Sequence, residues 1–591
     1  MTNAVSSIPP ALVFIVGGLL LPILPKRAQP VAFLLLPVLA LALLLQSEPG
    51  TRLTVPFLDY ELVVSQVDRL GLAFGYVFTI IAFLGGVYGF SVMGSGELVA
   101  ASLYAGSALG VVFAGDLFTL FIFWETMAVS SVCLIWARRS DQSYRAGMRY
   151  LLVHLFGGSV LLAGILWHLR ETGSIFFTAL EGGPAAYLIL FGFALNAAVV
   201  PLHTWLSDSY PEATVTGGVF LSAFTTKAAV CVLARAFSGW EILVWAGVVM
   251  AIYGVVFAVL ENDIRRLLAY HIISQVGYMV AGVGIGTETA INGVTAHAFA
   301  HILYKGLLFM GAGAVLHAVG RSKLTELGGL ARHMPFTVFL YMVGAFSISG
   351  VPLFSGFVSK SMVVYAAEMD YRGWVVLLLH LASIGTFLHT GLKLPYFTWF
   401  GGQRSARPGR VPTSMHVGMI LAALVNIGIG VYPAILYDLL PYAAYYQPYT
   451  LTHLTETMQL LSLTALGFWL LVDKLSGEPT ISLDVDWLYR KPARLMYRIA
   501  VSDVNRIFAS GEALALNVAR LMARASVNPA GYFMMLLRPV DGHAQKGRGD
   551  TSKPETYDPD RSRLAIGLVV IVVLLCFVIL VAANFVSSLF P

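Results

Sequence analysis

The chain has 591 residues, of which 58% are hydrophobic and only 12% are charged, and its formal net charge is +5. Its mean hydropathy of +0.78 is higher than that of soluble globular proteins, so the composition excludes a soluble enzyme and predicts a polytopic membrane protein. Cys133, Cys231 and Cys576 stand singly in apolar segments, which excludes a disulfide framework and a thiolate metal cluster.

Apolar runs of about 20 residues, the length that crosses about 30 Å of hydrocarbon, recur almost from one end of the chain to the other. They predict an all-α membrane protein with about sixteen transmembrane helices, two of them discontinuous. No basic segment precedes the first run, so we expect a retained helix there and not a cleaved signal peptide. The predicted spans are 9–25, 29–46, 70–93, 97–114, 116–137, 148–169, 185–210, 214–236, 240–260, 266–286, 290–319, 336–367, 374–400, 414–436, 455–474 and 562–588.

Basic residues are concentrated in alternate loops between these spans. By the positive-inside rule these loops face the cytoplasm, which places both termini on the outer side of a bacterial inner (plasma) membrane. The loops predicted to be cytoplasmic contain Lys26, Arg27, Arg138, Arg139, Arg145, Arg149, Arg265, Arg266, Arg321, Lys323, Arg332, Arg404, Arg407 and Arg410.

Glu125 is a charged residue deep inside the fifth predicted span, beside Trp124. An isolated carboxylate at that depth is costly unless it takes up a proton or meets a cation. We therefore interpret Glu125 as part of a proton or ion relay; the alternative is a buried group held by local hydrogen bonds. His154 in the sixth span is a candidate channel-lining residue, although a single histidine on an apolar face is also common in helix cores.

The stretch from Asn196 to Lys227 places proline, glycine and charge at membrane depth. Pro201 and Pro211 remove helix hydrogen bonds, and such breaks are tolerated only where the backbone is buried in protein or lines a cavity. The seventh span is therefore predicted to be discontinuous. Lys227 lies about ten residues into the next helix, far from both ends, which favours a buried group over a lysine that snorkels to the interface.

Three titratable residues share one face of the eleventh span. His297, His301 and Lys305 are spaced at i, i+4 and i+8, so they stack along the helix at about 6 Å per step and can pass protons. A zinc site is the alternative, but HAFAH lacks the glutamate of HExxH and no third ligand is near. The twelfth span then breaks at Pro352, and Lys360 follows eight residues later, which repeats the pattern of the seventh and eighth spans.

Discontinuous helices at corresponding positions indicate an internal repeat with ion sites near the bilayer midplane. Spans four to eight correspond to spans nine to thirteen, and because five is odd, the second copy is inverted. Residues 476–561 mix apolar and basic residues at helical spacing, which predicts an amphipathic helix at the membrane interface. The predicted parts are 1–95 (N-terminal transmembrane helices), 96–236 (first five-helix repeat), 237–400 (second, inverted repeat), 401–475 (peripheral transmembrane helices), 476–561 (amphipathic lateral helix and cytoplasmic linker) and 562–591 (C-terminal transmembrane anchor).

The motifs FWE, PLHTWLSDSYPEATVTGGVFLSAFTTK, ENDIRRLLAY, AHAFAHILYKGLLF and PLFSGFVSK occur in this order within residues 95–435. They resemble the antiporter-like subunits shared by Mrp cation/proton antiporters and respiratory complex I, and the Mrp D-type subunit most of all. The resemblance implies a proton path without a cofactor. Carried onto this sequence, the path consists of Glu125, Lys227, His297, His301, Lys305 and Lys360.

The chain departs from this family at one position. The resemblance implies a lysine five residues before the proline of PLHTW, as the partner of Glu125, and here that residue is Asn196. Asparagine cannot carry a proton, although it can hydrogen-bond or hold water. Asn196 and His203 of the same motif are therefore candidate channel-lining residues.

The resemblance implies a subunit of a multi-subunit cation/proton antiporter, a transporter component and not an enzyme by itself. Its expected partners are other antiporter-like and small Mrp-type subunits, contacted through the lateral helix, together with protons and sodium or potassium. Two alternatives stay open. The first is an antiporter-like subunit of a redox-driven pump, a membrane hydrogenase or an inorganic-carbon uptake complex; the second is a structural scaffold whose channel is impaired by Asn196.

Overall fold

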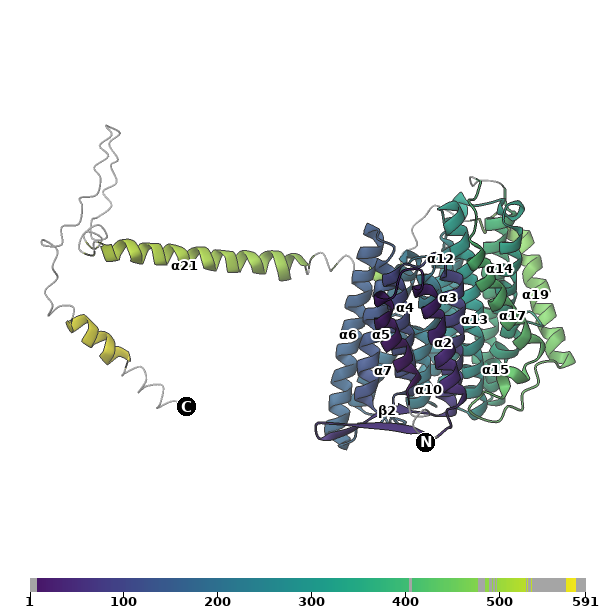
Figure 1. The fold of residues 1–591 in the computed structure, drawn as a ribbon, viewed down its shortest axis with the longest axis horizontal. Coiled ribbons are helices and arrows are strands. Elements are labelled where there is room, and N and C mark those ends of the chain that lie inside the picture. Colours follow the sequence, from purple (N-terminus) through teal and green to yellow (C-terminus); the bar gives the residue numbers. More distant parts are fainter. Residues whose placement is uncertain are drawn as a thin grey trace. The chain divides into compact units, whose positions relative to one another are not determined.

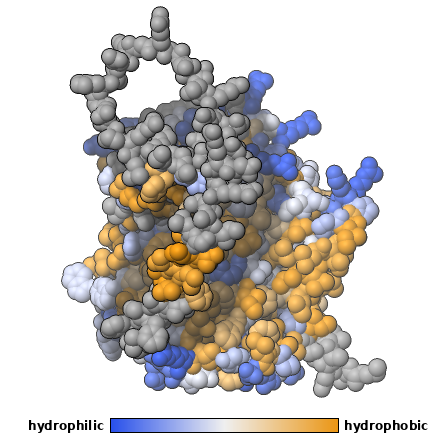
Figure 2. Space-filling view, turned by 90° about the vertical axis from the view of Figure 1, so that its left-hand side faces the viewer, coloured by the Kyte–Doolittle hydropathy of each residue, from blue (hydrophilic) through white to orange (hydrophobic). Residues whose placement is uncertain are grey.

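The protein is described here from a computed structural model, which covers residues 8–402, 407–476, 484–487, most of 492–527, single positions at 529 and 533, and 570–580. The chain divides into two compact units, Met1–Val485 and Asp486–Pro591. The first unit is a bundle of long helices that run side by side (Figure 1). Apolar side chains dominate its middle height, and hydrophilic side chains gather toward its top and bottom (Figure 2). This distribution fits a chain that crosses a bilayer.

The bundle begins with three helices and a hairpin. The helices are α1 (Pro10–Leu20), continued by the 3-10 turn η1 (Leu21–Ile23), α2 (Gln29–Leu45) and α3 (Arg69–Gly89). Between α2 and α3 lies an antiparallel hairpin of β1 (Arg52–Phe57) and β2 (Tyr60–Gln66), in which Phe57 pairs with Tyr60 across a two-residue turn. The hairpin was not predicted from the sequence, because a short connection of two strands contains no apolar run of membrane-spanning length.

Residues 96–236, which were predicted to form the first repeat, contain helices that match the predicted spans closely. The sixth is longer than predicted, because Ser140 and Ser143 form a capping box that starts α6 at Asp141 and not near 148. The seventh is broken as predicted, and the eighth is also interrupted, at Phe224. The elements are α4 (Ser95–Phe113), α5 (Leu117–Trp136), α6 (Asp141–Thr172), α7 (Pro184–Asn196), α8 (Thr204–Ser209), η2 (Tyr210–Glu212), α9 (Gly217–Ala223) and α10 (Thr225–Ala236).

The second repeat region and the helices after it also fall on predicted ranges. Its twelfth span is broken between α14 and α15, and its thirteenth changes from α-helix to π-helical turns. The elements are α11 (Glu241–Leu260), α12 (Ile264–Ile285), α13 (Glu288–Val319), η3 (Leu324–Glu326), η4 (Leu330–Arg332), α14 (Pro335–Ser349), α15 (Ser355–Met369), α16 (Gly373–Thr386), η5 (Phe387–Lys393), η6 (Tyr396–Phe400), α17 (Thr413–Val431), α18 (Ala434–Tyr437) and α19 (Leu451–Leu471).

Among the described residues, eleven helices are long and apolar enough to cross a membrane, and five shorter apolar helices accompany them. Every residue of the most apolar stretch of α9–α10 and of α12 is buried inside the bundle, whereas most of α19 is exposed. The polar residues of α10, α12 and α13 are therefore enclosed by protein. This enclosure is what makes their charges tolerable at membrane depth.

The loops meet in two groups, at opposite ends of the helices. At one end Arg138 forms an ion pair with Glu212 at 3.1 Å, and Asp263 pairs with the backbone of Lys323. At the other end Arg235 pairs with Asp68 at 2.7 Å. The first group holds the described loops that are rich in basic residues, and we name it the basic end. The positive-inside rule predicts that the basic end is cytoplasmic.

The second unit contains the π-helical turn η7 (Arg498–Asp503), α21 (Val504–Val527) and a helical stretch at residues 570–580. α21 is strongly amphipathic, as predicted for residues 476–561. That it lies along neighbouring subunits stays a prediction. The cytoplasmic linker predicted within 476–561 and most of the predicted anchor at 562–591 lie outside the described residues.

Candidate functional site

The helix break after α7 is held by a buried arginine. α7 ends at Asn196, Pro201 follows, and the chain resumes helical structure only at Thr204. Arg265, at the start of α12 and 1% exposed, donates to the carbonyl oxygens of Pro211 and Ala213 at 2.8 Å and of Thr214 at 2.9 Å. One guanidinium thus satisfies three carbonyls that the irregular backbone leaves without helix partners.

Lys227 lies on a second interruption. α9 ends at Ala223 and α10 begins at Thr225, so the carbonyl of Ser222 has no helix partner. The Lys227 ammonium is fully buried and donates to this carbonyl at 2.6 Å. The prediction that Lys227 faces the protein interior is confirmed. Its partner is a backbone oxygen and not a carboxylate.

Lys360 has a similar arrangement at the break between α14 and α15. α14 ends at Ser349, Gly350 adopts a left-handed conformation at φ 74°, and α15 starts at Ser355. The Lys360 ammonium lies 3.4 Å from the freed carbonyl of Ile348 and donates to Ser383 Oγ on α16 at 2.7 Å. At both helix breaks, therefore, a buried lysine contacts a carbonyl that the break exposes.

The predicted column of α13 is present and lacks protein hydrogen-bond partners. His297 and His301 are fully buried, and their ring centroids are 6.1 Å apart, as the i, i+4 spacing predicts. Neither imidazole nor the Lys305 ammonium has a hydrogen-bond partner among the described residues. Tyr304 lies beside both rings, 6.4 Å and 5.2 Å from their centroids. Buried polar atoms without protein partners are the atoms that ordered water usually satisfies.

Glu125 is less enclosed than predicted. Its residue is half-buried, but its Oε1 atom is buried without a hydrogen-bond partner among the described residues. The carboxylate packs on Gly158 of α6 so closely that a Cβ at Gly158 would lie 1.8 Å from Oε1. Asn196 Nδ2 is likewise buried and unpartnered, yet no direct hydrogen bond joins the two residues. Because Asn196 stands where the family places the partner of Glu125, the two residues were predicted to be linked directly or by water. The direct link is wrong for this structure, and the water-mediated link stays a prediction.

His154 packs against the broken helix. Its ring stacks on Tyr150 at 4.0 Å and meets Trp205 edge-on at 4.5 Å, and its Nδ1 lies 2.9 Å from the Tyr150 carbonyl. Nε2 has no partner in the part of the chain that the structure describes. These contacts favour a packing role for one side of the ring, and its role as a channel-lining residue stays a prediction.

His203 contacts a residue that the sequence analysis did not single out. His203 Nε2 lies 3.2 Å from Asp484 Oδ1, and the hydroxyls of Tyr253 and Tyr270 donate to the same carboxylate at 2.5 Å each. Burial alone would raise the pKa of Asp484, but His203 and the two hydroxyls outweigh it and lower the pKa to about 2. Because Asp484 is 281 positions from His203, no local pattern could have linked them.

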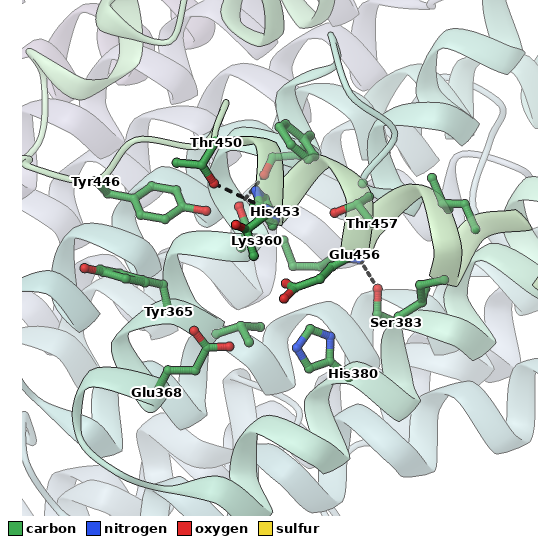
Figure 3. A pocket seen from close by; sticks show the side chains of 18 of the residues that line it. Lys360, Tyr365, Glu368, His380, Ser383, Tyr446, Thr450, His453, Glu456 and Thr457 are labelled. Atoms are coloured by element: carbon green, nitrogen blue, oxygen red, sulfur yellow. Dashed lines mark hydrogen bonds between the residues drawn. The ribbon is translucent and has the colours of Figure 1, made fainter.

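A cavity of about 700 Å³ opens beside Lys360. Glu456 and His380 point into this space, and Glu368, Tyr365 and His453 lie around it (Figure 3). Tyr445, which is 90% exposed, also lines the cavity, so the space reaches the protein surface. The lining residues come from α15, α16, α19 and the loop before α19, at the end of the bundle opposite the basic end.

Comparisons with known proteins agree with this geometry. Residues 114–388 match the family described as "NADH:quinone oxidoreductase/Mrp antiporter, TM". The chain is 30% identical over 341 residues to the D-type subunit of the Na(+)/H(+) antiporter of Alkalihalophilus pseudofirmus, covering 54% of this chain and 68% of that protein. It is 28% identical over 368 residues to Hydrogenase-4 component B of Escherichia coli, covering 55% of each. It spans about half to two thirds of the length of the curated relatives it matches.

A solved structure shares the fold. The Mrp complex from Dietzia sp. DQ12-45-1b contains a chain that superposes with a TM-score of 0.68 at 22% identity, covering 78% of this chain and all of that one. The chain therefore belongs to the antiporter-like membrane subunits shared by Mrp antiporters and respiratory complex I. It is a polytopic membrane protein of that family.

Proposed function

We propose that this protein is the proton-translocating subunit of a multi-subunit cation/proton antiporter, similar to the Mrp D-type subunit. The observation that supports this most is the row of buried groups that runs from Lys227 through the α13 column to Lys360. Lys227, His301 and Lys305 act electrostatically on one another, and His297 is an electrostatic neighbour of Lys360. Burying several neighbouring amines and imidazoles at membrane depth costs free energy. Such groups in membrane proteins typically form proton relays, so the row favours proton transfer as the function.

The proposed path begins at Glu125 and Lys227, continues along Lys305, His301 and His297, and ends at Lys360. From Lys360 the cavity lined by His380 and Glu456 gives protons a polar route to the surface. With the basic end in the cytoplasm, that surface is the outer face of the membrane. Both termini are then outside, and α21 lies on neighbouring subunits of the same complex.

A redox-driven assembly is the second candidate, since the chain is also similar to Hydrogenase-4 component B. In that case the same path would move protons, and an electron-transferring partner would supply the energy. The buried row argues against a purely structural scaffold, because Asn196 removes one titratable group and leaves the other six in place.

Lys360→Ala tests the proposal. In everted membrane vesicles that contain the assembled complex, we expect this variant to abolish proton-coupled cation transport while the amount of complex is unchanged. Lys323→Ala, which removes an exposed lysine at the basic end, is the matched control and should transport normally. Normal transport by Lys360→Ala would show that protons do not pass through this residue.

A further inference from the structure

Several buried cationic or imidazole groups lie outside the path described so far, and three of them are neighbours of one another. They are His271 on α12 and His389 and Lys393 on the π-helical turn η5, and each is at most 2% exposed. Neither ring nitrogen of His271 or of His389 has a hydrogen-bond partner among the described residues. Two orphaned imidazoles inside a membrane bundle are expensive, so a purely structural explanation for them is weak.

These groups are arranged as a row that joins the α13 column. The ring centroids of His271 and His389 are 6.4 Å apart, a separation that one water molecule can bridge. The electrostatic neighbours of His271 are Lys305, His389 and Lys360, and it also acts on His301. His389 in turn has Lys393 as its charged neighbour.

The far end of the row reaches the basic end of the bundle. The Lys393 ammonium donates at 2.5 Å to the carbonyl of Val259, in the last turn of α11, where carbonyls lack helix partners. Glu261, the residue that ends α11, is an electrostatic neighbour of Lys393. Asp263, two residues further on, pairs with the loop that contains Lys323. Lys393 therefore has the same contact with a freed carbonyl as Lys227 and Lys360.

The backbone that carries His389 and Lys393 departs from regular α-helix. α16 ends at Thr386 and continues as the π-helical turns η5 and η6, and π-helical turns in α-helices occur frequently at functional sites. Thr390, Thr398 and Trp399 on these turns also carry buried polar atoms without partners among the described residues. The wider turns thus collect polar groups beside the row, as a hydrated path through protein requires.

We propose that His271, His389 and Lys393 form a second proton branch, which takes up protons near Glu261 at the basic end and delivers them to the His301–Lys305 part of the column. In each step a nitrogen releases one proton to the next group or to a bridging water and accepts one from the preceding group, so the chain is regenerated and one proton is transferred. The inference rests on the proposed function and adds an intake for the second repeat. Together with Lys360 and its cavity, the branch then forms a proton path that crosses the whole membrane within the second repeat.

Three substitutions test the branch in the assembled complex reconstituted into liposomes, with a pH-sensitive dye reporting proton movement. A glutamine side chain keeps hydrogen bonding but cannot titrate, so we expect His389→Gln to lower the initial rate about tenfold or more. Lys393→Met should do the same. Lys393→Arg keeps the positive charge but cannot release its proton, so it should be as slow as Lys393→Met if Lys393 relays protons.

Two further variants separate the possible outcomes. His317→Gln, an exposed histidine at the end of α13, is the control and should transport normally. Normal transport by His389→Gln, or recovery by Lys393→Arg, would overturn the branch while Lys360→Ala still abolishes transport and the proposed function stands. Normal transport by Lys360→Ala would instead overturn the proposed function. If His389→Gln reduces the amount of complex, His271→Gln tests the same step from α12, with the same rate expected.

Discussion

Asp484 offers a prediction whose size can be worked out from the structure. Its carboxylate, 6% exposed, accepts hydrogen bonds from Tyr253 and Tyr270 and faces His203. The lowering of its pKa from the ordinary 3.8 to about 2 corresponds to about 2.4 kcal/mol, at about 1.36 kcal/mol per pH unit. Because the pKa is lowered on folding, this stability is fully present above pH 3.8 and is lost as the pH falls through about 2.

At neutral pH, Asp484→Asn should remove most of this stabilisation, since the amide is uncharged but still accepts one hydroxyl. The free energy that holds Asp484 against His203, Tyr253 and Tyr270 falls, and the detached state becomes at least tenfold and up to about sixtyfold more populated. The rate of trypsin cleavage after Arg490 should rise by the same factor where release of Asp484 precedes cleavage and is fast and reversible.

The control is Asp473→Asn, the same change at an exposed position after α19. It should leave the cleavage rate unchanged. A wild-type cleavage rate for Asp484→Asn at pH 7 would refute the reasoning, because it would mean that the charge on residue 484 does not hold this segment to the broken helix.

Two other predictions concern the broken helix after α7 and the residues around it. Arg265→Gln leaves at least two of three buried carbonyls without a donor, so we expect a loss of about 2 kcal/mol or more in thermal unfolding of the detergent-solubilised protein, whereas the exposed Arg321→Gln should unfold like the wild type. Asn196→Lys restores the cation that the family places there, and because an ammonium favours the charged carboxylate, the pH dependence of transport should shift downward. Glu125→Gln should be mild in the present chain; a severe loss, together with no pH shift in Asn196→Lys, would show that another cation already partners Glu125.

The sequence predicted what depends on local spacing. Apolar runs placed the helices because hydrophobic length is a property of each segment, and the i, i+4 spacing placed His297 and His301 on one face. Pro201 and Pro352 predicted two helix breaks, because a proline disrupts the helix in which it stands. The helix is interrupted between α9 and α10 at Phe224, which is neither proline nor glycine. The sequence therefore did not predict that the Ser222 carbonyl would be free to accept a hydrogen bond from Lys227.

Contacts between distant segments were beyond the sequence. Asp484 contacts His203 although 281 positions separate the two residues in the sequence. Glu456 on α19 faces the Lys360 cavity, although the sequence predicted only a peripheral helix there. His271 and His389 stand singly in apolar segments 118 positions apart, so each alone looks like a core histidine. Their two adjacent rings become informative only when the fold brings α12 and η5 together.

Three of the four buried lysines among the described residues share an arrangement that explains how a charge can be both tolerated and released. Lys227, Lys360 and Lys393 each donate to a carbonyl that a helix end or break has freed, at 2.6, 3.4 and 2.5 Å respectively. A carboxylate partner would hold the ammonium in a buried ion pair, which is costly to separate. A neutral carbonyl stabilises the charge less, so a small backbone displacement at the break shifts the balance between the charged and the neutral amine. Helix discontinuity therefore gives this protein lysines that can gain and lose a proton without an acidic partner beside each one.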